Sequence, residues 1–216
     1  MSKVINDLRL YADKIVRSGL VVGAGGNLSM RDGKIMYISP SGYDLQEIED
    51  HQWVRVDIES GEVLDPIKPS SEVLMHLECF RKRPDIEAVL HAHPSYSVGV
   101  SSAGQTIPHL FPDFPAMIRN VTYLEYLIPT TEVLANAVAE VIQDTDVVVM
   151  RNHGVLTVGK TMKEAYFFMQ IIEEAAKVYS IASTVGVPRI LTEEECEDLR
   201  NLSSEKFRSE LLKDSR

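Results

Sequence analysis

Three histidines occupy positions from which they could hold a metal ion. His91 and His93 lie two residues apart in the segment EAVLHAHP, which has the apolar character of a buried strand. Alternate residues of a strand project from the same face, so both imidazoles can converge on one ion. His153 precedes Gly154 at a turn between two short apolar runs, where side chains often face a cleft. Three histidines with an open fourth position are typical of a catalytic zinc site.

These histidines could instead have a purely structural role. A His-x-His pair alone is also compatible with two hydrogen-bonded histidines on one strand face. Pro94, which ends the strand beside His93, favours the metal because it places the pair near an opening. We expect His51, in a polar turn, and His76, on a predicted helix, to be surface or packing residues. His109 lies in the proline-broken loop IPHLFPDFP, which could line a pocket.

Three segments rich in glycine and serine, GAGGNLS, SPSG and PSSE, could bind an anion. Their backbone N–H groups are unobstructed, and PSSE also opens a predicted helix, whose N-terminus favours phosphate. Each alone is compatible with an ordinary turn or cap, but together they indicate a local phosphate site. GAGGNLS lacks a P-loop lysine and the preceding strand of a dinucleotide fold, so we expect no nucleotide cofactor. Glu72, the acid of PSSE, is either a helix cap or, beside a cation, a general base.

The elements that must position these residues alternate between helices and strands. Several strands are joined by hairpins too short for a crossover, so we expect an α/β protein with a mixed or largely antiparallel sheet covered by helices. Residues 105–130 show no clear pattern. Helical spacing of apolar residues predicts helices over 4–15, 70–82, 95–104, 130–142, 161–183 and 192–202. Strand patterns fall at 34–40, 53–64, 87–94 and 146–159. We expect a hairpin at Arg31-Asp32-Gly33.

Composition narrows the class of protein. The 216 residues carry a formal net charge of −10, which argues against nucleic acid and anionic membranes as partners. No apolar run reaches the roughly 20 residues that a membrane span needs, and two cysteines, Cys79 and Cys196, are too few for a disulfide scaffold. We therefore expect a cytoplasmic protein with one domain over residues 1–216, ending in a helical tail from about residue 190.

The motifs GGNLS, SPSG, PSSE, HAHP and NHG, in that order over residues 25–154, resemble the class II aldolase family. The resemblance implies a three-layer α/β/α fold with a mostly antiparallel central sheet, and a homotetramer with active sites at subunit interfaces. It implies a zinc ion, with manganese or cobalt as alternatives, held by His91, His93 and His153, with Glu72 as a further metal-site residue. Glu72 would be the catalytic acid/base, with a raised pKa, and the substrate phosphate would contact Asn27, Ser41, Gly42, Ser70 and Ser71.

The activity implied by this resemblance is retro-aldol cleavage of a ketose 1-phosphate, of the L-fuculose or 5-deoxypentulose type, to dihydroxyacetone phosphate and an aldehyde. A tyrosine that such aldolases donate across the interface is replaced here by Pro112, and no tyrosine follows Tyr179. Asp113, Tyr123 and Tyr126 are candidate substitutes as proton donors. Relatives with the same site include L-ribulose-5-phosphate 4-epimerase, methylthioribulose-1-phosphate dehydratase and sugar-acid-phosphate decarboxylases. The adducin head domain is a relative that binds without catalysis.

Overall fold

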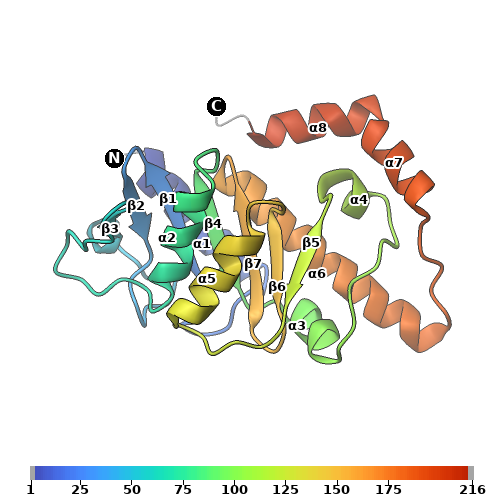
Figure 1. Cartoon of the computed structure of the whole chain (residues 1–216), viewed down its shortest axis with the longest axis horizontal. Coiled ribbons are helices and arrows are strands. Elements are labelled where there is room, and N and C mark those ends of the chain that lie inside the picture. Colours follow the sequence, from blue (N-terminus) through green and yellow to red (C-terminus); the bar gives the residue numbers. More distant parts are fainter. Residues whose placement is uncertain (1–2, 214–216) are drawn as a thin grey trace.

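The computed structural model describes residues 3–213, which form one seven-stranded mixed sheet with helices on both faces (Figure 1). The strand order is β3-β2-β1-β4-β7-β6-β5, and every neighbouring pair is antiparallel except β5 and β6. The expected α/β fold with a mixed, largely antiparallel sheet is confirmed. The strands are β1 (Asn27–Asp32), β2 (Ile35–Ile38), β3 (Val54–Asp57), β4 (Ala88–Ala92), β5 (Val121–Leu124), β6 (Val147–Met150) and β7 (Gly154–Gly159).

Helices form a layer on each side of this sheet. One face is covered by α1 and α6, which pack on each other and on the central strands, together with α3. The other face is covered by α2 and α5, whose apolar residues form a second core with β2, β3 and β6. The helices are α1 (Lys3–Arg17), α2 (Val73–Lys82), α3 (Ser95–Ser102), α4 (Asp113–Met117), α5 (Glu132–Val141), α6 (Met162–Val185), α7 (Glu193–Asn201), α8 (Ser203–Lys213) and the short 3-10 helix η1 (Asp50–Gln52).

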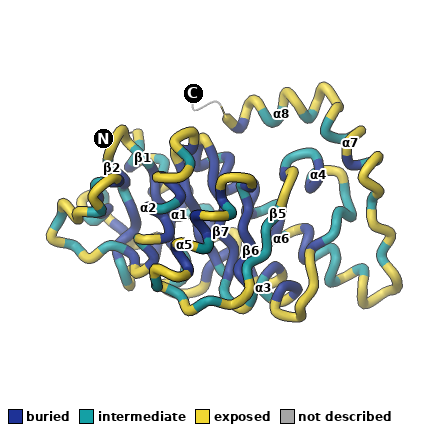
Figure 2. Tube along the Cα trace, viewed as in Figure 1, coloured by how far each residue is buried: buried dark blue, intermediate teal, exposed yellow. Residues whose placement is uncertain are grey.

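The central strands are buried along their whole length (Figure 2). All residues of β4, β6 and β7 are buried because helices lie over both faces, and their apolar sequences follow from this position. By contrast, all four residues of β5, the edge strand, are half-buried. This explains why residues 121–124 show neither strand alternation nor a continuous buried apolar run, and the rest of 105–130 is irregular apart from the five-residue α4.

The pairing of β4 brings three distant segments to one edge of the sheet. Its neighbour on one side is β1, with Asn27 opposite His91, and on the other side β7, with Leu156 opposite His91. Both neighbours run antiparallel to β4, so its carboxyl end lies beside the start of β1 and the start of β7. The edge thus joins the GGN segment, His91 of β4 with the following His93, and the turn that contains His153.

Two predicted segments differ in detail from the structure. The helix predicted from Ser70 begins at Val73, because the chain at Pro69 and Ser70 is still extended and bridges to Ser39 and Pro40. PSSE therefore precedes α2, and Glu72 occupies its N-cap position without capping the helix through its side chain. In the stretch 53–64, only β3 is a strand, followed by a single bridge between Val56 and Val63.

The C-terminal segment is helical over α7 and α8 and lies along one side of the molecule. α7 packs against α4, and α8 returns to the start of α6, where the Thr161 hydroxyl donates to the Leu212 carbonyl at 2.7 Å. Among residues 3–213, no helix has both the length and the apolar character needed to cross a membrane.

Thr161 offers a test of how α6 and α8 are joined. Its buried hydroxyl also accepts from the Glu164 amide at 3.0 Å as the N-cap of α6, so Thr161→Ala removes two hydrogen bonds. We expect a loss of about 1–2 kcal/mol in the free energy of unfolding by urea. Thr161→Ser keeps the hydroxyl and should lose less than half as much. Equal losses in the two variants would show that the hydroxyl is not what stabilises this junction.

Candidate metal centre

The structure brings the three predicted histidines together. His91 lies near the end of β4 and is completely buried, His93 follows that strand by one residue, and His153 lies in the turn between β6 and β7. The ring nitrogens that they offer all lie within 4.8 Å of one another. The His91 and His93 Nε2 atoms are 3.0 Å apart. This arrangement can hold one ion between three imidazoles.

The tautomer of His91 leaves Nε2 free to bind a cation. Its Nδ1 lies 3.0 Å from the Val155 carbonyl oxygen, which can only accept, so Nδ1 carries the hydrogen. When His91 is neutral, the lone pair on Nε2 points toward His93. Nitrogens around a tetrahedral zinc ion at about 2.0–2.1 Å lie roughly 3.3 Å apart, close to the observed separation. The backbone partner of Nδ1 is the kind that orients metal-binding histidines.

Glu72 completes the group as a buried carboxylate. Its Oε2 lies 3.2 Å from His91 Nε2, and its Oε1 lies 3.2 Å from His153 Nε2. Oε1 receives no well-aligned hydrogen bond, and His153 Nδ1 is also buried without a partner. Buried polar atoms without partners are unusual in native proteins, and a cation beside Oε1 would satisfy that oxygen. The donor set of three imidazoles and a carboxylate fits a divalent ion such as zinc.

The environment favours the protonation states that bind metals. Burial lowers the pKa of His91 to about 3 and holds the pKa of His93 below its usual range, so both rings are neutral at pH 7. For Glu72, burial raises the pKa, but the nearby His91 and the contacts with His153 and Asn27 outweigh it and lower the pKa. This direction is opposite to the raised pKa expected for Glu72, because the effect of its polar partners is larger than that of burial.

Glycines allow the backbone to pass close to the imidazoles. A Cβ on Gly154 would lie 2.5 Å from the Ala92 carbonyl oxygen and 2.8 Å from ring carbons of His91 and His93. Gly26 has a φ of +72°, and its Cβ would meet a Val21 methyl carbon at 2.5 Å. Side chains at either position would displace the segments that carry the histidines. The NHG and GGN motifs therefore have a steric basis.

The three predicted anion-binding segments converge beside Glu72. SPSG and PSSE are held side by side by the Pro40–Pro69 bridge and by the Ser70 amide, which donates to the Ser39 carbonyl at 2.9 Å. The third segment contributes Asn27, whose Nδ2 donates to Glu72 Oε2 at 2.9 Å. Of the residues expected to contact phosphate, Asn27 and Ser70 are buried, while Ser41, Gly42 and Ser71 reach the surface.

The candidate proton donors lie in different surroundings. Asp113 forms an ion pair with Arg208 at 2.9 Å, and the Tyr123 hydroxyl accepts from the Ile107 amide at 2.8 Å. Tyr126 is 54% exposed and follows β5 by two residues. The end of β5 lies at the histidine edge, because the Arg151 amide donates to the Leu124 carbonyl at 3.0 Å.

The other histidines and the cysteines lie outside the cluster. His51 is exposed, as expected. His109 stacks edge-on against Phe114 and lies 3.5 Å from the Cys196 Sγ, so it belongs to the packing of α7 on α4. Cys79 and Cys196 are both buried free thiols.

His76 is a polar residue of the site that sequence reasoning missed. It is completely buried on α2, where its ring contacts the side chains of Asn27 and Ser29. Its position four residues after Glu72 was the available signal, since such residues share one face of a helix. The expectation of a surface or packing role overlooked that shared face.

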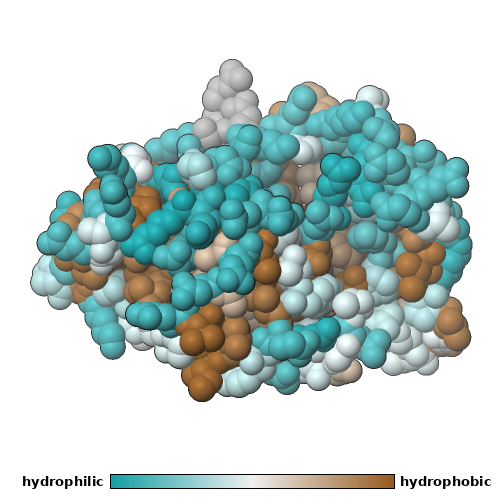
Figure 3. Space-filling view, viewed as in Figure 1, coloured by the Kyte–Doolittle hydropathy of each residue, from teal (hydrophilic) through white to brown (hydrophobic). Residues whose placement is uncertain are grey.

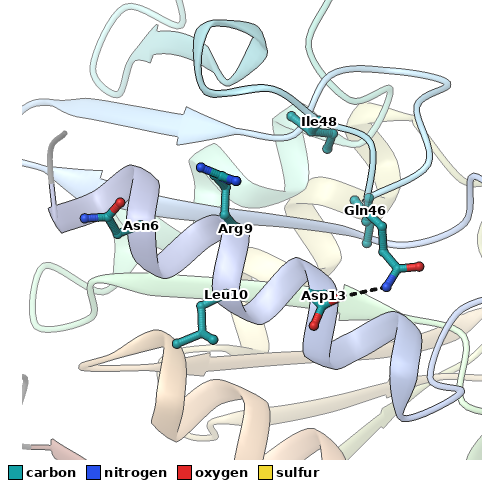
Figure 4. A pocket seen from close by; sticks show the side chains of 7 residues that line it. Asn6, Arg9, Leu10, Asp13, Gln46 and Ile48 are labelled. Carbon is teal, nitrogen blue, oxygen red and sulfur yellow. Dashed lines mark hydrogen bonds between the residues drawn. The ribbon is translucent and has the colours of Figure 1, made fainter.

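A hollow of about 390 Å³ lies elsewhere, between α1 and the loop that follows β2 (Figure 4). Gln46 closes one part of it by donating to the Asp13 carboxylate at 2.7 Å. Its lining contains none of the predicted site residues and consists of Asn6, Arg9, Leu10, Asp13, Leu45, Gln46 and Ile48.

Comparison with known proteins agrees with this geometry. A 5-deoxy-D-ribulose 1-phosphate aldolase of Bacillus thuringiensis serovar kurstaki is 34% identical over 92% of this chain and 94% of its own. A 3-oxo-tetronate 4-phosphate decarboxylase of Escherichia coli is 31% identical over 93% of this chain and 98% of its own. A solved L-fuculose 1-phosphate aldolase, 33% identical, superimposes with a TM-score of 0.86 over 96% of this chain and 97% of its own.

The family comparison covers most of the chain. The model of the class II aldolase and adducin N-terminal domain matches residues 6–180, which include all seven strands and the complete histidine cluster. The chain therefore belongs to the class II aldolase and adducin family.

Proposed function

We propose that the protein is a metal-dependent aldolase that cleaves a ketose 1-phosphate into dihydroxyacetone phosphate and an aldehyde. The observation that carries this proposal is the convergence of His91, His93 and His153 on Glu72, beside the SPSG and PSSE segments. Class II aldolases depend on a divalent metal, and this group could bind one. Zinc suits three imidazoles best, with manganese or cobalt as alternatives.

The metal and Glu72 would have separate roles. Bound to the three histidines, the ion would act as a Lewis acid and stabilise the negative charge that develops on the ketose oxygens. As the C3–C4 bond breaks, its electron pair remains with the ketose half and the C4 hydroxyl loses its proton. That proton would pass to the Glu72 carboxylate, directly or through the group that takes it from the C4 hydroxyl, and Glu72 would then deliver it to C3, which completes dihydroxyacetone phosphate. In the condensation direction Glu72 would remove the same proton from C3.

Two further groups would hold the substrate and handle its protons. The phosphate would lie against Asn27, Ser41, Gly42, Ser70 and Ser71, whose segments converge within reach of Glu72. For the proton of the C4 hydroxyl, Tyr126 is the strongest candidate of the three. Its exposed position beside the histidine edge supports this, whereas Asp113 and Tyr123 already have partners inside the chain.

The substrate we favour is a 5-deoxypentulose 1-phosphate. The Bacillus relative, similar over nearly the full length of both chains, carries a name that refers to such a substrate. L-Fuculose 1-phosphate is the alternative, but Pro112 stands where those aldolases are expected to have a tyrosine. A decarboxylase is the second candidate function, because a decarboxylase relative also matches over most of its length. Retention of all three histidines and Glu72 argues against a binding domain of the adducin type.

We further propose that the enzyme is a cytoplasmic homotetramer with active sites at subunit interfaces. Apolar side chains are exposed where the chain enters α5, with Ile128 67% and Val133 64% accessible. Figure 3 shows apolar atoms at the surface over this end of α5, on a face that is otherwise largely hydrophilic. A neighbouring subunit would cover these side chains. For a tetramer, sedimentation equilibrium should give a mass four times that of the 24.2 kDa chain.

The direct test of the function is product analysis with metal-reconstituted enzyme and a panel of ketose 1-phosphates. We expect dihydroxyacetone phosphate and an aldehyde, with the 5-deoxypentulose 1-phosphate cleaved fastest. An isomeric pentulose phosphate would instead identify an epimerase, a diketone a dehydratase, and CO₂ from a sugar-acid phosphate a decarboxylase. Any of these products without dihydroxyacetone phosphate would contradict the proposal.

His93→Ala tests the metal site. We expect the bound metal to fall well below one ion per chain and turnover to fall to background, because the site loses one of its three imidazole ligands. Metal content is measured by mass spectrometry after dialysis, with circular dichroism to confirm folding. His51→Ala, at an exposed histidine, is the control and should keep its metal. Unchanged metal content in His93→Ala would rule out this site.

Glu72→Gln separates metal binding from proton transfer. The amide cannot carry the proton to C3, so we expect kcat to fall about 10²–10⁴-fold while the three histidines keep the metal. Glu62→Gln, at an exposed glutamate after β3, should behave as wild type. Near-normal kinetics of Glu72→Gln would refute the acid/base role.

A further inference from the structure

A chain of hydrogen bonds runs behind the carboxylate of Glu72. Asn27 Nδ2 donates to Glu72 Oε2 at 2.9 Å, and Asn27 Oδ1 lies 2.5 Å from His76 Nε2. On the other side of the ring, His76 Nδ1 lies 2.7 Å from the Ser29 hydroxyl. All four residues are buried, and His76 and Ser29 are completely so. Water therefore has little access to this chain.

Each hydrogen bond in this chain has only one possible direction. The Glu72 carboxylate is an acceptor, so Asn27 must present its NH₂ group to it and its Oδ1 to His76. Oδ1 can only accept, so His76 Nε2 must carry a hydrogen, whether the ring is neutral or charged. Burial lowers the pKa of His76 to about 4, so the ring is neutral at pH 7 and Nδ1 accepts from the Ser29 hydroxyl.

The asparagine amide is the vulnerable member of this chain. An amide can flip by 180°, which would turn Oδ1 toward the Glu72 carboxylate and place two acceptors against each other. The His76 N–H prevents this flip because it binds only the Oδ1 end. Ser29 holds the ring in the required tautomer, since its hydroxyl supplies the hydrogen that Nδ1 lacks.

We infer that His76, oriented by Ser29, is a positioning residue that fixes the Asn27 amide and through it the Glu72 carboxylate. Among the described residues, the side-chain hydrogen bonds of His76 go to Asn27 and Ser29. None of them goes to the three candidate metal-binding imidazoles. Its effect on catalysis therefore passes through the Asn27 amide to Glu72. The catalytic consequence depends on the proposed aldolase function, whereas the orientation of the chain does not.

The matched variants are His76→Gln and His76→Asn. The Gln amide nitrogen can take the place of Nε2 and donate to Asn27, whereas the shorter Asn amide reaches only the Ser29 side. We expect kcat to fall about 10²-fold in His76→Asn and less than about tenfold in His76→Gln, with metal content unchanged in both. Equal kcat values in the two variants, or wild-type kcat in His76→Asn, would overturn the inference.

A double mutant distinguishes positioning from a general structural role. If His76 acts through Glu72, then His76→Asn should cost almost nothing further in the Glu72→Gln background. A merely structural role would lower the rate by the same factor in both backgrounds, and that result would overturn the inference.

An NMR measurement on the wild-type protein tests the same inference without an activity assay. It remains decisive if the variants fail to fold or if the enzyme is not an aldolase. In the ¹⁵N-labelled, zinc-loaded wild-type protein, long-range ¹H–¹⁵N correlation reports which ring nitrogen of His76 carries hydrogen. We expect a protonated Nε2 at pH 7. An unprotonated Nε2 would overturn the inference, whatever reaction the enzyme catalyses. Failure of the aldolase assay with Nε2 protonated would count against the proposed function alone.

Discussion

The arrangement of the site depends on the antiparallel pairing of β4 with both of its neighbours. This register places His91 opposite Asn27 on one side and Leu156 on the other, so three segments drawn from a stretch of more than a hundred residues meet at one edge of the sheet. A slip of one residue would turn His91 of β4 to the opposite face. Because β4 is buried on both faces, burial alone does not fix this register, and the contacts of His91 with the Val155 carbonyl and Glu72 distinguish it from a slipped pairing.

The same edge concentrates polar groups that would be costly to bury singly. His91, Glu72, Asn27 and His76 are all buried, and their hydrogen bonds to each other and to the Val155 carbonyl satisfy most of them. Two buried atoms of the candidate metal site, Glu72 Oε1 and His153 Nδ1, have no hydrogen-bond partner. The side chains behind Glu72 are hydrogen-bonded to one another, whereas the ring nitrogens of the three candidate metal-binding histidines lie close together in front of it. Such an arrangement suits a metal cation, because each ligand atom is already held in position.

Much of the fold and of the candidate site could be predicted from the sequence. For the remaining features there is a physical reason why the sequence does not reveal them. His91 and His93 were accessible to prediction because strand geometry has a fixed period of two, and Thr161 because helix caps are local. β5 was not, since a half-buried edge strand leaves neither an alternating nor a continuous apolar pattern. The role of His76 depends on contacts between β1 and α2, and the lowered pKa of Glu72 depends on His91, His153 and Asn27, all distant in sequence. No local pattern encodes these contacts. The extended chain at Ser70 likewise depends on pairing with Ser39, thirty residues earlier.

The central claim is that three imidazoles from β4 and the β6–β7 turn surround a single divalent ion. X-ray absorption spectroscopy at the metal edge of the purified protein tests it most directly. The account predicts one ion per chain with three histidine nitrogens in its first shell, at about 2.0–2.1 Å for zinc. A first shell that contains sulfur, or only oxygen atoms, would contradict it.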